Sequence, residues 1–209
     1  PAGAKSKGKA ELMDWFDDTH GIRSVEDLTA RYPAPPDMVV KKQIDLLDAH
    51  AQTMVEKSPF LIMGTTGPKG TDCSPRGGAP GFVQVFDEKT LLLPDWPGNN
   101  RLDSLRNIIA NPAVGLIFLF PGLGDILRVN GNARLSVHPD LLQRFAGSDG
   151  KVPRSVIVIT VGEVFVHCPR AIAFGDIWNP EKYVDRNSLP TLREVFETHV
   201  KISSSRQNS

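Results

Sequence analysis

Seven short runs rich in Val, Ile, Leu, Phe and Thr as a group, separated by turn signals, constrain the fold of this chain most strongly. Turn signals such as Gly67-Pro68-Lys69-Gly70 separate several of them. Connections this short join antiparallel strands, because parallel neighbours need crossovers of about a dozen residues or more. We therefore expect a mainly antiparallel sheet of six or seven strands, whose closure into a small β-barrel would remove its edges. The runs begin after residue 58 and read FLIMGTT, TDCSPR, GFVQVFD, TLLL, VGLIFLF, ILRVNGNARLSV and SVIVITVGEVFVHC.

Helical patterns precede and interrupt these runs. Ser24 followed by Asp27 resembles a capping box and predicts a short helix over 25–31. Apolar residues in steps of three and four over 36–56 predict one helix with a single buried stripe. Two further helices are expected between the strands, over 100–110 and 138–146.

The organisation expected is one structural domain with helical additions. A chain of 209 residues that is 40% hydrophobic is long enough to bury one sizeable core. We expect residues 1–57 to form an N-terminal helical segment that packs on the barrel, with residues 1–10 as a loose end. The barrel itself is expected over 58–200, and a flexible tail over 201–209.

Composition excludes several functional classes. Lys+Arg and Asp+Glu both number 24, so the formal charge is zero and predicts neither a nucleic-acid footprint nor a basic membrane patch. The longest apolar runs fall well short of the roughly 20 residues that span a bilayer. Cys73 and Cys168 fit no metal-binding or redox spacing, so we expect no metal site and a reducing cytoplasm.

An arginine near a predicted helix start raises the first functional hypothesis. In LLLPDWPGNNRLDSLRNIIANPAVGLIF a helix is expected to begin near Asn99 or Asn100, which puts Arg101 in its first turn. A helix N-terminus already carries partial positive charge and unpaired N–H groups, so it favours anions over cations. The position of this arginine therefore needs an explanation.

A bound phosphate is one explanation. Asn99 and Asn100 can cap the helix, and Ser104 lies one turn further on, so a phosphate there would be surrounded by donors. Its two negative charges would compensate Arg101. The alternatives need no ligand: Asp103 alone balances the arginine, or the arginine lies on the surface with its stem on apolar neighbours.

A second arginine lies in CSPRGGAPGFVQV. Arg76 precedes a Gly- and Pro-rich stretch that leads into the strand expected over 82–86. As structure alone, this is a β-bulge or a wide loop with an exposed arginine. As function, two arginines from different elements would clamp one phosphate. Neither segment matches a Walker loop or a G-x-G-x-x-G fingerprint, so nucleotide binding by those loops is not supported.

Several of these stretches, in this order, resemble one family. Over about residues 58–180 the order SPRG…PGFVQVFDEKTLLLPDWPGNNRLDSLRNIIANPAVGLIFLFPG…LRVNGNARL is similar to the pyridoxamine 5'-phosphate oxidase-related, FMN-binding split-barrel proteins. An uncharacterised flavoprotein branch has the same PD-x-PGN-x-R-x-D-S and LRVNG-x-A stretches. The later stretch FVHCPRAIAFGDIWNP is similar to HCPKA…W-x-P of that branch.

The resemblance implies a fold, a cofactor, an oligomeric state and site residues. The implied fold is a six-stranded, Greek-key-like split β-barrel with peripheral helices, and the implied assembly is a homodimer with FMN in a cleft between the subunits. The flavin phosphate would be held by Arg76 and by Asn100-Arg101, with Asn99 and Ser104 nearby.

The resemblance also assigns residues to the rest of the cofactor. Val83 and Gln84 match the strand that lines the flavin ring. Pro94 and Asp95 match the strand end beside the phosphate and the ribityl chain. Trp178 would reach across the dimer to the flavin.

Departures from the oxidase pattern shape the functional expectation. The C-terminal stretch LREVFETHVKISSSRQNS lacks the Arg-x-His with which the oxidase grips its substrate, and Gln84 stands where that enzyme has lysine. We therefore expect an FMN-dependent oxidoreductase for another small molecule, with NAD(P)H as a candidate reductant, rather than vitamin B6 oxidation. No catalytic residue is assigned. A non-catalytic flavin- or haem-binding split barrel and a deazaflavin-dependent reductase remain alternatives.

Overall fold

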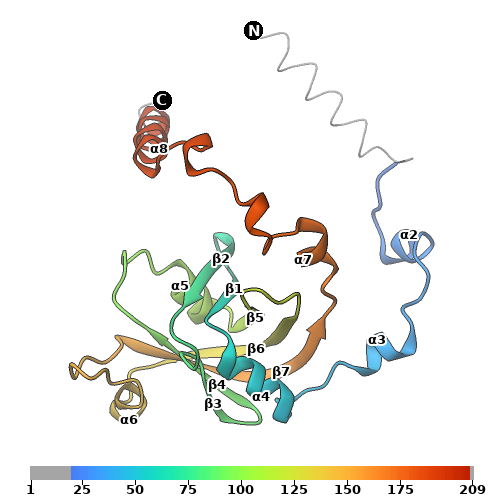
Figure 1. The fold of residues 1–209 in the computed structure, drawn as a ribbon, viewed down its shortest axis with the longest axis horizontal. Helices are drawn as coiled ribbons and strands as arrows, with labels where there is room; N and C mark the ends of the chain where they lie inside the picture. Colours follow the sequence, from blue (N-terminus) through green and yellow to red (C-terminus); the bar gives the residue numbers. More distant parts are fainter. Residues whose placement is uncertain (1–19, 208–209) are drawn as a thin grey trace. The chain divides into compact units, whose positions relative to one another are not determined.

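The computed structural model describes residues 20–207 and divides the chain into two compact units, residues 1–43 and 44–209 (Figure 1). The loose end predicted for residues 1–10 lies outside the described residues. The boundary at 43/44 falls earlier than the expected boundary at 57/58, because the last helix before the sheet belongs to the second unit.

The described part of the first unit, residues 20–43, contains two short helices, α2 (Val25–Thr29) and α3 (Asp37–Lys41), neither of which has a buried residue. The side chain of Ser24 accepts a hydrogen bond of 3.0 Å from the Asp27 N–H, which confirms the predicted N-cap of α2. The helix predicted over 25–31 is therefore present, and it ends two residues earlier than expected.

The single helix predicted over 36–56 is wrong, because residues between its two halves pair with the sheet. Ile44 forms a two-way backbone bridge with Val164, and the Leu47 N–H donates to the Glu88 carbonyl at 2.8 Å. Helical structure resumes only at α4 (Ala49–Lys57), in the second unit. Its N-cap is Asp48, whose side chain accepts a hydrogen bond of 2.8 Å from the Ala51 N–H.

The second unit is built on a seven-stranded sheet in the order β2-β1-β5-β6-β7-β4-β3, with every neighbouring pair antiparallel (Figure 1). This confirms the predicted fold class, a mainly antiparallel split barrel with peripheral helices. The strand count is one more than the resemblance implied, and the order ends at β2 and β3 rather than closing. The strands are β1 (Phe60–Gly67), β2 (Gly70–Gly77), β3 (Gln84–Asp87), β4 (Thr90–Asp95), β5 (Ala113–Leu119), β6 (Ile126–Ser136) and β7 (Ser155–His167).

Helices fill the connections and follow the last strand. The helices predicted over 100–110 and 138–146 are present in shorter form as α5 (Asp103–Ala110) and α6 (Pro139–Gln143). His138 caps α6 by accepting a hydrogen bond from the Asp140 N–H at 3.3 Å. Residues 201–207 of the tail are helical, as part of α8. The elements after β7 are α7 (Arg170–Gly175), η1 (Pro180–Lys182), η2 (Arg186–Ser188) and α8 (Leu192–Gln207).

The core lies on one face of the sheet. Alternate residues of β1, including Leu61 and Met63, are fully buried, as the period of two requires. Leu47, which lies just before the N-cap of α4, and Val55 within α4 belong to the core cluster. Ile108 of α5 belongs to the same cluster. Each fully buried aliphatic side chain stabilises the fold by roughly 1.5–3 kcal/mol, so both helices are fixed against the sheet largely by this burial.

The long β6–β7 ladder has a register shift next to Gly131. A Cβ atom at this position would lie 2.2 Å from the Thr160 carbonyl oxygen, which is backbone and has little room to move. The glycine therefore permits the close approach of the two strands at the irregularity.

Gly131→Ala should lower the free energy of unfolding by about 1–3 kcal/mol, because the added methyl forces the backbone of β7 away. Chemical denaturation of the full chain measures this. Gly64→Ala is the matched control, because the nearest atom to its added Cβ is at an ordinary 3.7 Å, and it should leave stability nearly unchanged. Equal stability of the two variants would contradict the packing argument.

Candidate functional site

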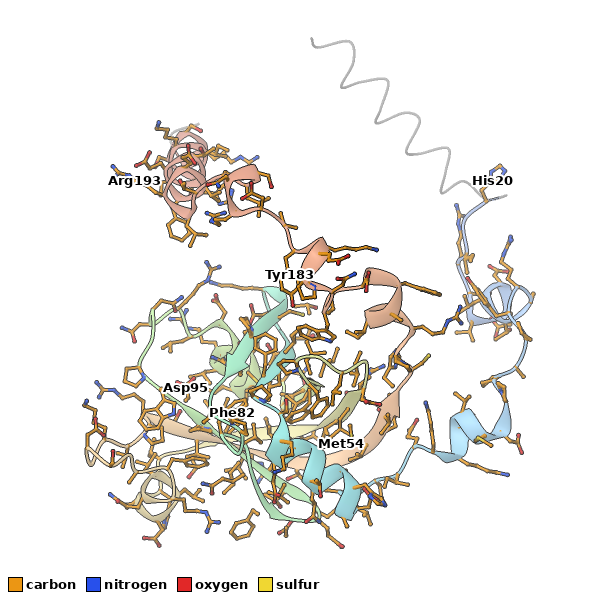
Figure 2. All side chains as sticks on the ribbon, viewed as in Figure 1. His20, Met54, Phe82, Asp95, Tyr183 and Arg193 are labelled. Carbon is orange, nitrogen blue, oxygen red and sulfur yellow. The ribbon has the colours of Figure 1, made fainter. Side chains whose placement is uncertain are left out.

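A cavity of about 660 Å³ lies where β2, the end of β4 and the start of α5 meet. β2 and β4 are not neighbours in the sheet, so the curled sheet brings them together at its split (Figure 2, where Asp95 at the end of β4 is labelled). The cavity is lined by Asp72, Ser74, Pro75, Arg76, Asp95, Trp96, Pro97, Gly98, Asn99, Asn100, Arg101, Leu102, Asp103, Ser104, Leu105, Arg154 and Ser155.

β2 supplies one wall through the alternation of its side chains. Asp72, Ser74 and Arg76 are half-buried and share one face, while Cys73 and Pro75 between them are exposed. Of these three residues, only Arg76 was predicted from the sequence. The alternation of residues in TDCSPR is the signal that could have placed Asp72 and Ser74 on the same face as Arg76.

Ser104 ties this wall to α5. Its side chain is 4% exposed, and its hydroxyl donates to Asp72 Oδ2 at 2.6 Å. Because that hydroxyl has only one proton, the Ser74 hydroxyl must donate in the 2.9 Å bond between the two serines. The start of α5 is thus fixed to β2 by a small polar network.

Arg76 and Asp95 face each other across the split. Arg76 Nη1 lies 3.8 Å from Asp95 Oδ1, and the side chains are 27% and 14% exposed. Arg76 Nε is buried and has no hydrogen-bond partner among the described residues. Burial raises the pKa of Asp95 above its usual value, and the nearby Arg76 charge opposes this rise.

The position predicted for Arg101 is wrong by one turn. α5 begins at Asp103, with Leu102 as its N-cap in the left-handed region at φ 60°, so Arg101 precedes the helix and Asn99 and Asn100 do not cap it. The Asn99 side chain instead accepts a hydrogen bond of 3.0 Å from the Arg101 N–H. Asn100 also has a positive φ of 58°, as its residue type tolerates.

The positive charge of Arg101 near the start of a helix is balanced by a neighbouring carboxylate. Arg101 Nε donates to the Asp103 carboxylate, and this hydrogen bond raises the pKa of the guanidinium. The Arg101 side chain is 81% exposed. Balance by Asp103, the alternative that needs no ligand, is therefore the arrangement in the structure.

The start of α5 nevertheless has features of an anion site. No side chain caps this helix, and its first three residues all line the cavity. The first N–H groups of a helix favour anions, since they carry partial positive charge and lack intrahelical acceptors. The aspartates of the lining oppose anion binding, because they equal the arginines in number. The charged lining residues are Arg76, Arg101, Arg154, Asp72, Asp95 and Asp103.

Four of the predicted site residues lie elsewhere. Val83 is buried in the core, and Pro94 is buried within β4. Gln84 exchanges hydrogen bonds of 3.2 and 3.3 Å with the backbone and side chain of Arg144. Trp178 Nε1 donates to the Leu123 carbonyl of its own chain at 2.8 Å.

Arg154 had no sequence signal. Its backbone N–H donates to the Asp95 carbonyl at 2.9 Å, where the β4–β7 ladder begins with the pair Asp95 and Ser155. Its place in the cavity lining therefore depends on a strand pairing between distant parts of the chain. Within residues 20–207 no group of three or more His, Cys, Asp or Glu side chains is arranged to hold a metal ion. No helix in the same part of the chain is long and apolar enough to span a membrane.

Comparison with known proteins decides the family. The family model described as pyridoxamine 5'-phosphate oxidase matches residues 47–168, which is more than half of the chain. The chain belongs to this family. The match to the pyridoxamine 5'-phosphate oxidase family runs from Leu47, two residues before α4, to Cys168, the residue after β7, and it includes every residue that lines the cavity.

Solved structures of similar fold are more distant from this family member. HupZ from Group A Streptococcus is 17% identical, with 57% of this chain and 92% of that chain covered and a TM-score of 0.47. General Stress Protein 26 from Bacillus anthracis str. Sterne is 13% identical, with coverage of 55% and 88% and a TM-score of 0.40. A related protein of the pyridoxinephosphate oxidase family from Clostridium acetobutylicum is 13% identical, with coverage of 59% and 94% and a TM-score of 0.41. No curated protein matches the chain.

Ser104→Ala should lower the free energy of unfolding by about 1–3 kcal/mol, because it removes a buried hydroxyl and leaves the half-buried Asp72 and Ser74 of β2 without their hydrogen bonds to it. Thermal or chemical denaturation measures the loss. Ser203→Ala, at an exposed position of α8, is the control and should change stability by no more than about 0.5 kcal/mol. A Ser104→Ala variant as stable as the control would contradict the role of Ser104 as a fixed link.

Proposed function

We propose that this protein is an FMN-binding flavoprotein that holds the flavin phosphate in the cavity between β2, β4 and α5. The observation that carries the proposal is Arg76, which lines this cavity and whose buried Nε has no hydrogen-bond partner among the described residues. An unsatisfied buried donor costs about 1–3 kcal/mol, so an anion that accepts from it gains a charge-assisted hydrogen bond and removes that cost.

The volume and the other lining groups of the cavity also suit the phosphate end of FMN. Its volume of about 660 Å³ lies within the range of small-molecule and cofactor sites. The uncapped start of α5, which Ser104 fixes to β2, adds N–H donors to the same cavity. Arg101 is exposed, and the carboxylate with which it forms an ion pair lies two residues away, so its guanidinium can turn toward a ligand at little cost.

The activity that we propose is that of an FMN-dependent oxidoreductase acting on a small molecule. A bound flavin supplies hydride-transfer chemistry, while the protein supplies binding and orientation. Arg76 and the start of α5 would anchor the phosphate end, and Trp96, which also lines the cavity, offers an apolar surface nearby. Gln84 stands where the oxidase has lysine and bonds to Arg144, which supports a substrate other than the B6 vitamer of the oxidase.

We further propose that the protein works as a homodimer in the cytoplasm. Large apolar side chains after β7 are exposed in the single chain, among them Phe174 at 79%, Leu192 and Phe196. Apolar surface of this kind is typical of an interface that another subunit covers. Cys73 and Cys168 are both free and exposed, which suits a reducing compartment.

Arg76→Met should weaken FMN binding about tenfold to 150-fold, because it removes a charge-assisted hydrogen bond worth about 1.5–3 kcal/mol while keeping the apolar stem. Titration of flavin fluorescence with the purified protein measures the affinity. Arg134→Met, at an exposed position on β6 outside the cavity lining, is the matched control and should bind FMN like the wild type. Wild-type protein that does not bind FMN, or equal affinity in both variants, would refute the proposed site.

Light scattering at micromolar concentration should give the mass of a dimer, since the exposed apolar side chains would be covered in it. Replacing Phe174 and Phe196 with Ser should shift the mass toward the monomer of 22.9 kDa. A wild-type monomer at this concentration would contradict the proposed assembly.

A further inference from the structure

We propose that the Asp95 carboxylate is an internal counter-anion of the cavity, which competes with the anionic group of a ligand for Arg76, so that protonation of Asp95 strengthens anion binding. This inference rests on the anion site proposed above, and it adds that pH controls the affinity of that site. The class of ligand is any molecule with a phosphate or sulfate group.

The geometry of the pair makes Asp95 a competitor. At 3.8 Å from Arg76 Nη1, its Oδ1 is within ion-pair distance but too far for a hydrogen bond. The carboxylate therefore neutralises the guanidinium without satisfying its donors, and Nε of the same guanidinium remains without a partner. A ligand oxygen can make the hydrogen bond that Asp95 does not make, but it must share the charge of Arg76 with Asp95.

The backbone holds Asp95 in this position. It ends β4, pairs with Ser155 at the start of β7, and accepts the Arg154 N–H at 2.9 Å. With its backbone fixed and its side chain only 14% exposed, the carboxylate cannot move freely into water when an anion arrives. The remaining way to reduce the repulsion between the Asp95 carboxylate and the bound anion is protonation of the carboxylate.

The other charged groups of the cavity have partners of their own or stand further into solvent. From β2 and the start of α5, Asp72 accepts from Ser104 and Asp103 pairs with Arg101. From the start of β7, the Arg154 side chain lies in an exposed position. Asp95 is thus the carboxylate that stands opposite Arg76. The charged groups that face the cavity are Asp72, Arg76, Asp95, Arg101, Asp103 and Arg154.

The sign of the pH dependence follows from the repulsion between a bound anion and the Asp95 carboxylate. Burial raises the pKa of Asp95 above 3.8, and Arg76 opposes the rise. A bound anion adds negative charge nearby and draws on the charge of Arg76, so it raises the pKa of Asp95 further. Binding and proton uptake are therefore linked. The anion affinity increases as pH falls from the pKa of Asp95 in the complex to its lower pKa in the free protein, and the whole increase is tenfold for each pKa unit that separates the two.

Inorganic sulfate is the probe, because it keeps its two charges across the pH range used and needs no flavin. Its dissociation constant is measured by calorimetry from about pH 8 to about pH 5, where folded proteins are usually most stable. Wild-type protein should bind sulfate roughly tenfold more tightly at the acid end. Asp95→Asn should bind more tightly than wild type at the alkaline end and lose most of the pH dependence. Asp125→Asn, at an exposed position between β5 and β6, is the control and should follow the wild type.

A second measurement needs no variant. Calorimetry of the wild type in two buffers of different ionisation enthalpy should show net proton uptake when sulfate binds at the acid end. No net uptake, no sulfate binding at any pH, equal pH dependence in wild type and Asp95→Asn, or weaker binding by that variant at alkaline pH would each overturn the proposal.

FMN titrations of the same samples separate this inference from the proposed function. Sulfate binding with the expected pH dependence, but no FMN binding, supports the counter-anion and refutes the flavin site. FMN binding in samples whose sulfate affinity shows no dependence on Asp95 supports the flavin site and overturns the counter-anion.

Discussion

The curvature of the sheet is the constraint on which the candidate site depends. β2 stands at one end of the strand order and β4 near the other, yet Arg76 on β2 lies within ion-pair distance of Asp95 on β4. A fully closed barrel would fill this junction with backbone hydrogen bonds. Because the ladder stays open there, side chains meet at the split instead, and a cavity of about 660 Å³ remains between them. The open sheet thus provides a site that a closed barrel would not have.

Charge balance decides how such a cavity can work. Three arginines and three aspartates line it, and two of the arginines already face carboxylates of the same chain. The two pairs differ in burial, since the Arg101–Asp103 pair is exposed and the Arg76–Asp95 pair is largely buried. An exposed pair contributes little and rearranges readily, whereas a buried pair imposes its charge on whatever binds. The proposal that the Arg76–Asp95 pair controls anion binding rests on this difference in burial.

Sequence patterns predicted the strands, most helices and part of the site, and they failed where distant segments pair. The caps at Ser24 and His138 depend on neighbouring residues, so their patterns were sufficient. The periodicity over 36–56 was equally regular, but Ile44 pairs with Val164, and this long-range backbone pairing interrupts the helix. Arg76 was a candidate from its own motif and Asp95 from the family resemblance, whereas Arg154 reaches the cavity through the pairing of β4 with β7, which no local pattern predicts.

By itself the sequence determined the antiparallel strands, the turns between them and the family, because alternation, Gly-Pro turn chemistry and ordered motifs are properties of contiguous residues. Only the tertiary structure decided that Arg101 precedes its helix and pairs with Asp103, and that Asp95 stands opposite Arg76. Those outcomes depend on the backbone conformation at Asn100 and Leu102, the pairing of β4 with β7 and the curvature of the whole sheet. Coulomb interactions and desolvation act through distances in space, which local sequence patterns do not specify.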